Sequence, residues 1–268
     1  MTNSCPIDLD VERLRAEIAN LYTRVASEPD GEFHFHRGPE YAAAFLGYDM
    51  ADLEALPSEC SRSFAGVGNP HLIGRIHAGE TVVDVGCGAG MDLLLAARRV
   101  GRAGKAVGVD MTARMLLQAR SAAAAVGLDQ IEIVEGDAAS LPLPDASADV
   151  VISNGVLNLV PEKEKVFADI VRILRPGGRL HLADIVLDRA LSEDIRSNVD
   201  LWTSCIAGAL PEAELVTVLI GAGLEEAQVV QHFDCFSATS KEKVALEFGV
   251  HGVNVFARKP AMTKANSK

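Results

Sequence analysis

The chain has 268 residues, of which 49% are hydrophobic, enough to bury one full core with an appended segment. A net charge of -12 disfavours nucleic-acid binding. No apolar run approaches the roughly 20 residues that span a bilayer, and the acidic, polar N-terminus lacks a signal-peptide layout, so a cytoplasmic protein with no membrane partner is expected.

Residues 1–75 are expected to form helices and loops that cover a site. Apolar residues recur at helical spacing over residues 8–28. His34 and His36 lie two apart without a third ligand nearby, so hydrogen-bonded histidines are favoured over a metal site there. The glycine-rich segment 63–70 forms either a turn into the core or a lid over the site.

An apolar run followed by a glycine turn opens the core. Residues 82–85 are typical of a buried parallel strand, and a helical pattern resumes soon afterwards. Glycines between a strand and a helix allow the backbone to approach a ligand at the helix N-terminus. The acid inside the strand and the three glycines are Asp84, Gly86, Gly88 and Gly90. Their Gly-x-Gly-x-Gly spacing differs from the dinucleotide fingerprint, although the glycines alone also fit a dinucleotide turn or a plain tight turn.

The next two strands lead to acids that suit a nucleoside. The strand at residues 105–110 ends in Asp110, which can accept hydrogen bonds from both ribose hydroxyls. Dehydrogenases place an acid there too, and Asp110 or Thr112 also fits a helix cap. After the third strand, Asp137 can accept from an adenine amine, and Ala138 has a backbone N–H free to donate.

The rest of the chain continues the alternation of strands and helices. We expect a strand at 146–154 that ends at Asn154, a helix at 163–174 and a strand at 179–186. A helical insert at 190–211, a helix at 212–220 and strands at 227–232 and 252–257 follow. This alternation predicts a doubly wound α/β sheet.

Taken together, these motifs resemble those of class I S-adenosylmethionine (SAM)-dependent methyltransferases, and within that class they are most similar to arsenite methyltransferases. The closer similarity rests on Gly-Val-Gly-Asn-Pro70, Val-Gly-Val-Asp-Met-Thr112, Ile-Ser-Asn-Gly-Val-Leu-Asn-Leu159 and Cys-Ile-Ala-Gly-Ala-Leu210. The resemblance implies a seven-stranded Rossmann-like sheet whose last strand is antiparallel, behind a helical N-terminal cap. The methyltransferase domain would then span residues 76–260, and residues 261–268 would form a disordered tail.

The resemblance also implies that SAM is the cofactor. The residues that would contact it are Asp84, Gly86, Gly88, Gly90, Asp110, Met111, Asp137, Ala138 and Asn154. Methyl transfer is an in-line displacement that depends mainly on alignment of the acceptor with the methyl group. An oxygen acceptor would also need a base, and the sequence does not point to one.

The chain departs from the arsenite methyltransferases at the substrate. Those enzymes hold As(III) with thiolates from three places, and two of these places are Val67 and Gly155 here, which leaves Cys205. A soft ion prefers several thiolates. Cys60 or Cys235 would therefore have to supply a second thiolate, although a free cysteine is usually a small core residue.

Three functions are therefore compared. The first is methylation of a small molecule other than arsenic, with Cys205 and Trp202 on the substrate side, although Trp202 fits core packing equally well. The second is arsenite methylation by Cys205 with Cys60 or Cys235, and the third is a SAM-binding module without catalysis. A dehydrogenase ranks below these. Cys87 is expected to pack beside the cofactor, no Cys-x-x-Cys pair indicates a metal, and the oligomeric state stays open.

Overall fold

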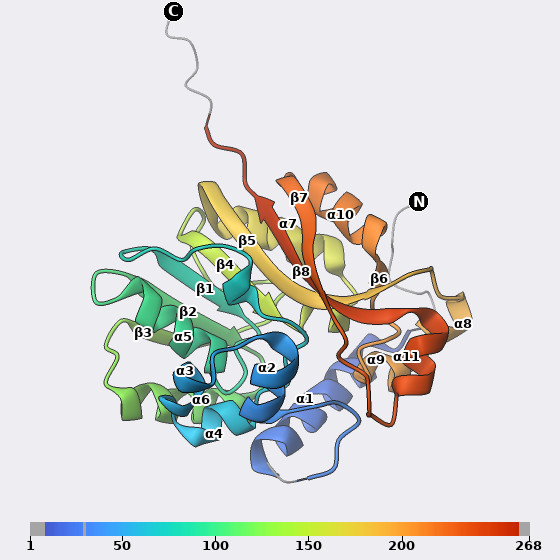
Figure 1. The fold of residues 1–268 in the computed structure, drawn as a ribbon. Helices are drawn as coiled ribbons and strands as arrows, with labels where there is room; N and C mark the ends of the chain where they lie inside the picture. The colour runs from blue at the N-terminus through green and yellow to red at the C-terminus, as the bar shows by residue number, and fades with distance from the viewer. Residues whose placement is uncertain (1–8, 29–30, 263–268) are drawn as a thin grey trace, which may run out of the picture.

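The computed structural model describes residues 9–28 and 31–262, and its centre is a twisted, mostly parallel sheet (Figure 1). The strands follow the order β3-β2-β1-β4-β5-β8-β7, and a short β6 pairs with β5. Strand β8 runs antiparallel to both of its neighbours, which confirms the predicted seven-stranded sheet with an antiparallel last strand. The strands are β1 Thr81–Val85, β2 Lys105–Asp110, β3 Ile131–Glu135, β4 Ala148–Asn154, β5 Leu174–Leu187, β6 Leu210–Pro211, β7 Glu225–Phe233 and β8 Val250–Arg258.

Helices cover both faces of this sheet. In β1, Val82 packs in a cluster with Ala96 and Val100 of one helix, whereas Val83 faces the opposite cluster, which contains Phe167 of another. A strand buried on both faces has apolar residues at successive positions rather than alternate ones, as Val82 and Val83 show, and Asp84 is the one polar residue among residues 82–85. The covering helices are α5 Met91–Val100, α6 Ala113–Val126, α7 Lys163–Ile173 and α10 Glu212–Gly221.

The N-terminal region folds into four helices beside the carboxyl ends of the strands (Figure 1). These are α1 Val11–Ser27, α2 Gly38–Leu46, α3 Met50–Glu54 and α4 Ser58–Arg62, followed by the 3₁₀ turn η1 Pro70–Leu72. The two five-residue helices α3 and α4 were not predicted, because one turn is too short to show a helical period. His34 and His36 contact the backbone carbonyls of Thr203 and Ser237, which ties this region to the C-terminal half.

The segment 190–211, predicted as a helical insert, is only partly helical. That segment forms two short helices, α8 Glu193–Arg196 and α9 Val199–Thr203, and then turns into β6. Cys205 has a left-handed φ of 63°, which no α-helix permits, and a side chain at Gly208 would overlap the carbonyl of Asn158. Helix α11, Glu242–Phe248, was also not predicted.

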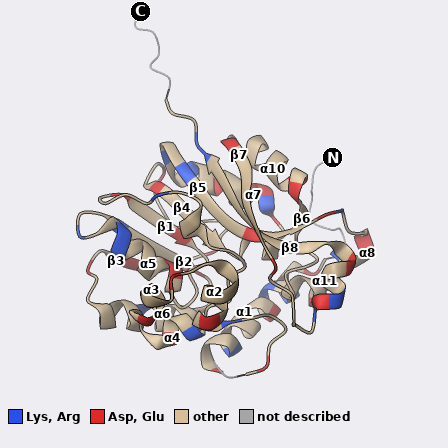
Figure 2. Ribbon diagram, in the orientation of Figure 1, with Lys and Arg blue, Asp and Glu red and all other residues tan. Residues whose placement is uncertain are grey.

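Charged residues are dispersed over the outside of the molecule. Figure 2 shows Lys and Arg interspersed with Asp and Glu on the outer helices and loops, while the middle of the sheet is largely free of them. None of the helices in residues 9–28 and 31–262 is long and apolar enough to cross a membrane. The tail predicted to be disordered lies outside the described residues from 263 onward.

A buried acid joins β5 to the 3₁₀ turn η2, Leu157–Leu159. Asp184 is 3% exposed, and its carboxylate accepts hydrogen bonds from the backbone N–H groups of Asn158 (3.0 Å) and Ile185 (2.7 Å). Burial raises its pKa from 3.8 to about 6, and the hydrogen bond from Ile185 and the charge of Lys163 oppose the rise. The folded state therefore holds a proton on Asp184 more tightly than the unfolded chain does.

This shift predicts a pH-dependent contribution to stability. Because the folded pKa is raised, the contribution is present below pH 3.8 and is lost as the pH rises through about 6. The free energy of unfolding of the wild type relative to Asp184→Asn should therefore fall by about 3 kcal/mol between these limits. Urea denaturation from pH 4 to 7.5 measures it, with exposed Asp129→Asn as the control. A pH-independent difference would contradict the assignment.

Candidate functional site

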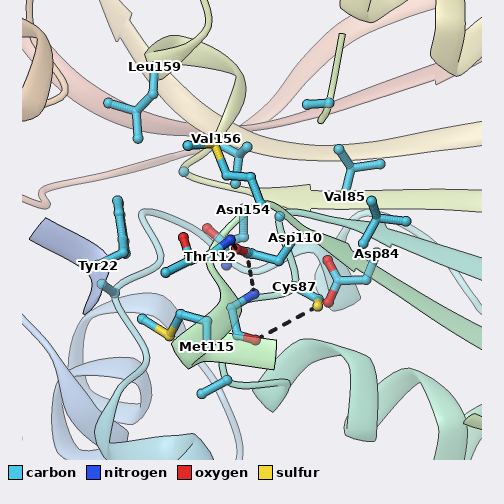
Figure 3. Close-up of a pocket in the computed structure, with 18 of the residues that line it drawn as sticks. Tyr22, Asp84, Val85, Cys87, Asp110, Thr112, Met115, Asn154, Val156 and Leu159 are labelled. Carbon is cyan, nitrogen blue, oxygen red and sulfur yellow. Dashed lines mark hydrogen bonds between the residues drawn. The ribbon is translucent and has the colours of Figure 1, made fainter. Parts of the chain in front are cut away.

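A cavity opens where β1, β2 and β4 end, next to α1 (Figure 3). It contains about 1110 Å³ of space, including the part open to solvent, which suits a cofactor together with a small substrate. Its wall includes every predicted cofactor residue except Gly90, namely Asp84, Gly86, Gly88, Asp110, Met111, Asp137, Ala138 and Asn154. Gly90 instead lies behind the wall as the N-cap of α5.

The glycine turn leaves a bare stretch of backbone at the cavity. Gly86 has a φ of 75°, and a side chain there would overlap that of Val156. The N–H of Gly88 donates to Oδ2 of Asp110 over 2.9 Å, which holds the turn against the end of β2. Cys87 is buried within the turn, where its sulfur packs close to Gly108.

Asp110 is fixed by the backbone on both sides of its carboxylate. Oδ1 accepts from the N–H of Thr112 over 2.8 Å, and Oδ2 accepts from Gly88. Burial raises its pKa, and these two hydrogen bonds oppose the rise. Thr112 is the N-cap residue of α6 but makes no capping hydrogen bond with its side chain. Each carboxylate oxygen keeps a second lone pair, so Asp110 can still accept from a bound ligand.

Asp84 carries an unsatisfied oxygen into the cavity. The residue is 2% exposed, and its Oδ2 has no hydrogen-bond partner among the described residues. Burial raises the pKa of Asp84 well above its ordinary value, and the charges of Asp92 and Asp110 add to the rise. A buried carboxylate without a partner is costly, so this position fits a ligand that brings a positive charge and N–H donors.

Asn154 holds the glycine-rich segment 63–70 in place. Its Oδ1 accepts from the N–H groups of Val67 (2.8 Å) and Gly68 (3.3 Å), and its Nδ2 donates to Asp92 (3.0 Å). Asp92 also accepts from Tyr48 over 2.7 Å. With these bonds, the segment forms a wall of the cavity. Sequence reasoning missed Tyr48 and Asp92, because only the fold brings them to Asn154.

The cysteines divide into two groups. Cys60, on α4, lines the cavity and donates to the carbonyl of Pro57 over 3.0 Å. Cys235 donates to the carbonyl of Val67 over 2.9 Å, and the charge of Cys205 is among the causes that raise its pKa. Cys235 is thus bonded at Val67, one of the family thiolate positions, whereas Cys60 lies on α4. Burial raises the pKa of each of the three thiols to about 12, so all are neutral near pH 7.

Val67 and Gly155, the two family thiolate positions that have no cysteine here, lie side by side. A side chain at Gly155 would come within 3.6 Å of Cγ1 of Val67, in ordinary contact.

Trp202 lies elsewhere: it is 2% exposed, packs with α1 and donates a hydrogen bond from its Nε1–H to the carbonyl of Arg196 over 2.6 Å. Neither Trp202 nor Cys205 lines the cavity, so their contact with substrate stays a prediction.

Helix α1 adds a charge at the far end of the cavity. Arg15 lies 3.2 Å from Oδ2 of Asp137 and 3.4 Å from Oε1 of Glu162, with about half of its side chain exposed. Ile18 and Tyr22, one and two turns further along α1, also line the cavity. These residues were not predicted, because a helical period does not reveal which site the helix faces.

Methyltransferases are among the proteins to which this chain is similar. A family model described as a methyltransferase domain matches residues 76–241. The arsenite methyltransferase of Halobacterium salinarum is 38% identical over 81% of this chain and 56% of its own length, and that of Aquipseudomonas alcaligenes is 40% identical over 49% and 40%. The crystal structure of an arsenic(III) SAM methyltransferase from Chlamydomonas reinhardtii superposes with a TM-score of 0.65 at 31% identity, over 80% of this chain and 73% of that one.

The chain thus spans less than two thirds of the length of these two curated relatives. The family model matches more than half of its residues. The sheet order and the cavity at the strand ends agree with a methyltransferase domain. The chain belongs to the class I SAM-dependent methyltransferases, and its cofactor is S-adenosylmethionine.

Proposed function

We propose that this methyltransferase acts on a small, largely apolar molecule that accepts the methyl group on a soft atom, sulfur or an activated carbon, and that As(III) is not its acceptor. The observation that carries the proposal is that Val67 and Gly155 lie side by side, close enough for a side chain at Gly155 to touch Val67, where two thiolates would stand. A soft As(III) ion bound by several thiolates would find a branched hydrocarbon and a bare backbone there.

The cofactor-side roles follow from the carboxylates of the cavity. Bound SAM supplies an electrophilic methyl group on a sulfonium. The unpaired oxygen of Asp84 suits the ammonium of its methionine end, and the free lone pairs of Asp110 suit the ribose hydroxyls. Asp137 and Ala138 are proposed to bind the adenine edge. Met111 is 39% exposed beside the cavity, and we assign it to the adenine face.

The wall beyond the glycine turn supports an apolar acceptor. It is built largely from Ile18, Tyr22, Phe64, Val156 and Leu159, and among the described residues that line the cavity there is no histidine or lysine. An oxygen acceptor would need a base to remove its proton. A thiolate or stabilised carbanion already carries the electron pair that displaces the sulfide, so these residues need only align it and exclude water.

Arsenite methylation is the second candidate, and one observation favours a particular form of it. Cys235 donates to the carbonyl of Val67, at one of the family thiolate positions, whereas Cys60 lies on α4. A two-thiol site would therefore use Cys205 with Cys235 rather than with Cys60. Both thiols would have to ionise against pKa values near 12, which makes this candidate the weaker one.

The cofactor roles predict that Asp110→Asn weakens SAM binding. The variant keeps the shape of the side chain but replaces one acceptor oxygen and removes the charge. Loss of a charge-assisted hydrogen bond should raise the Kd for SAM by roughly 10- to 100-fold. Isothermal titration calorimetry measures the Kd, and Asp129→Asn, on an exposed turn, serves as the control. An unchanged Kd for Asp110→Asn would remove Asp110 from the cofactor site.

The acceptor proposal is tested with labelled SAM and paired acceptors. Thiophenol, which ionises readily near neutral pH, should be methylated faster than phenol, because no histidine or lysine lines the described cavity to take the proton of phenol. As(III) in excess glutathione should give no methylated arsenic above the protein-free blank, with the Chlamydomonas enzyme as positive control. Equal rates on phenol would contradict the soft-atom proposal.

The same assay separates the alternatives. Turnover of As(III) that disappears in both Cys205→Ser and Cys235→Ser, but persists in Cys60→Ser, would establish the two-thiol arsenite enzyme. Stoichiometric SAM binding without methylation of any acceptor would instead favour a binding module without catalysis.

A further inference from the structure

Three side chains that can bind a metal meet outside the cavity, and they come from three different elements. Glu212 is the first residue of α10, His232 lies on β7 and His251 on β8. Each offers one ligand atom, and the three atoms lie within 4.8 Å of one another. None of the three residues lines the cavity described above.

The sheet register sets this arrangement. His232 pairs with Val253 across β7 and β8, so His251, two residues away from Val253, projects from the same face. The two imidazole rings are diagonal neighbours, with centroids 5.2 Å apart. Helix α10 starts immediately after Pro211 of β6, which pairs with β5, and this connection places Glu212 beside the rings.

The side chains already have contacts that suit ligation. Nδ1 of His251 lies 3.0 Å from the carbonyl oxygen of Gly249. A hydrogen bond from Nδ1 to that carbonyl leaves the lone pair on Nε2, the arrangement that second partners of metal-bound histidines impose. Nε2 of His232 lies 2.8 Å from Oε2 of Glu212, and Asp188 Oδ1 lies 3.8 Å from Nδ1 of His251.

The remaining gap is small enough for side-chain rotation to close. Ligands bound to zinc at about 2.0–2.1 Å in a tetrahedron are roughly 3.3 Å apart, so separations of up to 4.8 Å must shrink by about 1.5 Å. The side chains of His232 and Glu212 are 55% and 41% exposed, and His251 is 24% exposed. The more buried His251 can stay in place while the more exposed side chains of His232 and Glu212 rotate toward it.

We propose that Glu212, His232 and His251 bind one zinc ion. Two imidazole nitrogens with one carboxylate favour a borderline ion such as Zn²⁺ over Mg²⁺ or Ca²⁺, which prefer oxygen ligands, and three protein ligands leave a fourth position for water or an external ligand. The neighbouring hollow contains further acids, Asp188, Asp234 and Glu242, whose negative charge attracts cations.

The ion would fasten α10 to the β7–β8 pair. Strand β7 ends at Phe233, and the chain then reaches Cys235, which is bonded to the carbonyl of Val67. His232 itself lies outside the cavity, so zinc there would leave the cofactor residues in place. This inference does not depend on the identity of the methyl acceptor.

The test is a zinc titration of the full chain, freed of any affinity tag. One equivalent of Zn²⁺ should bind the wild type and the control His77→Ala, whose histidine is exposed on a turn before β1. Affinity should fall at least tenfold in His232→Ala and in His251→Ala. Zinc should raise the melting temperature of the wild type and of His77→Ala but not of those two variants.

Cobalt substitution identifies the ligands. The Co²⁺ complex should show ligand-field bands without a near-ultraviolet thiolate charge-transfer band, because the proposed donors are nitrogen and oxygen. The proposal is overturned if the wild type binds no stoichiometric zinc, if both histidine variants bind it unchanged, or if the thiolate band appears. The Kd for SAM, measured on the same variants, should stay unchanged, which separates this outcome from that of the cofactor assignments.

Discussion

The side-chain amide of Asn154 joins the parts of the chain that enclose the cavity. It stands at the carboxyl end of β4, where a parallel sheet leaves room for a ligand. Its oxygen holds the backbone at Val67 and Gly68, and its nitrogen bonds Asp92 at the start of α5. An amide is suited to this task because it both donates and accepts. The N-terminal segment therefore becomes a wall of the site instead of a separate appendage.

The electrostatics of the cavity follow from the same network. Three carboxylates, Asp84, Asp92 and Asp110, converge on the glycine turn and its helix, and burial raises the pKa of Asp84 and Asp110. Tyr48 is buried against Asp92, and its pKa is raised as well. Such an acidic cavity destabilises the ligand-free protein and favours a cationic cofactor. The charge of SAM and its amine complement what the folded chain leaves unpaired.

The acceptor chemistry that we propose differs from that of a thiolate site. Val67 and Gly155 offer no sulfur, and burial raises the pKa of Cys60, Cys205 and Cys235 to about 12, so these thiols are neutral near pH 7. An apolar wall binds by excluding water rather than by coordination. The metal-binding chemistry that we propose for this chain lies instead at the outer edge of the sheet, on histidines and a glutamate.

The sequence by itself determined the order of the strands and helices and, through the family resemblance, the antiparallel last strand, and it pointed to the acids that we assign to the cofactor. These depend on local patterns: apolar runs, glycines at fixed spacing and an acid at a strand end all lie within one or two adjacent elements. The short helices α3, α4 and α11 and the broken insert were missed, since a single turn has no period and the turn at Cys205 depends on its packing.

Only the tertiary structure decided which distant residues meet. Asn154 reaches Tyr48 and Asp92, Cys235 bonds the carbonyl of Val67, and Glu212 meets two histidines across three elements. Such contacts depend on the sheet register and on how the helices pack. Both are fixed when segments far apart in the chain bury their apolar side chains together. A local pattern carries no record of them, because the residues are far apart in the chain and are joined only when the core is complete.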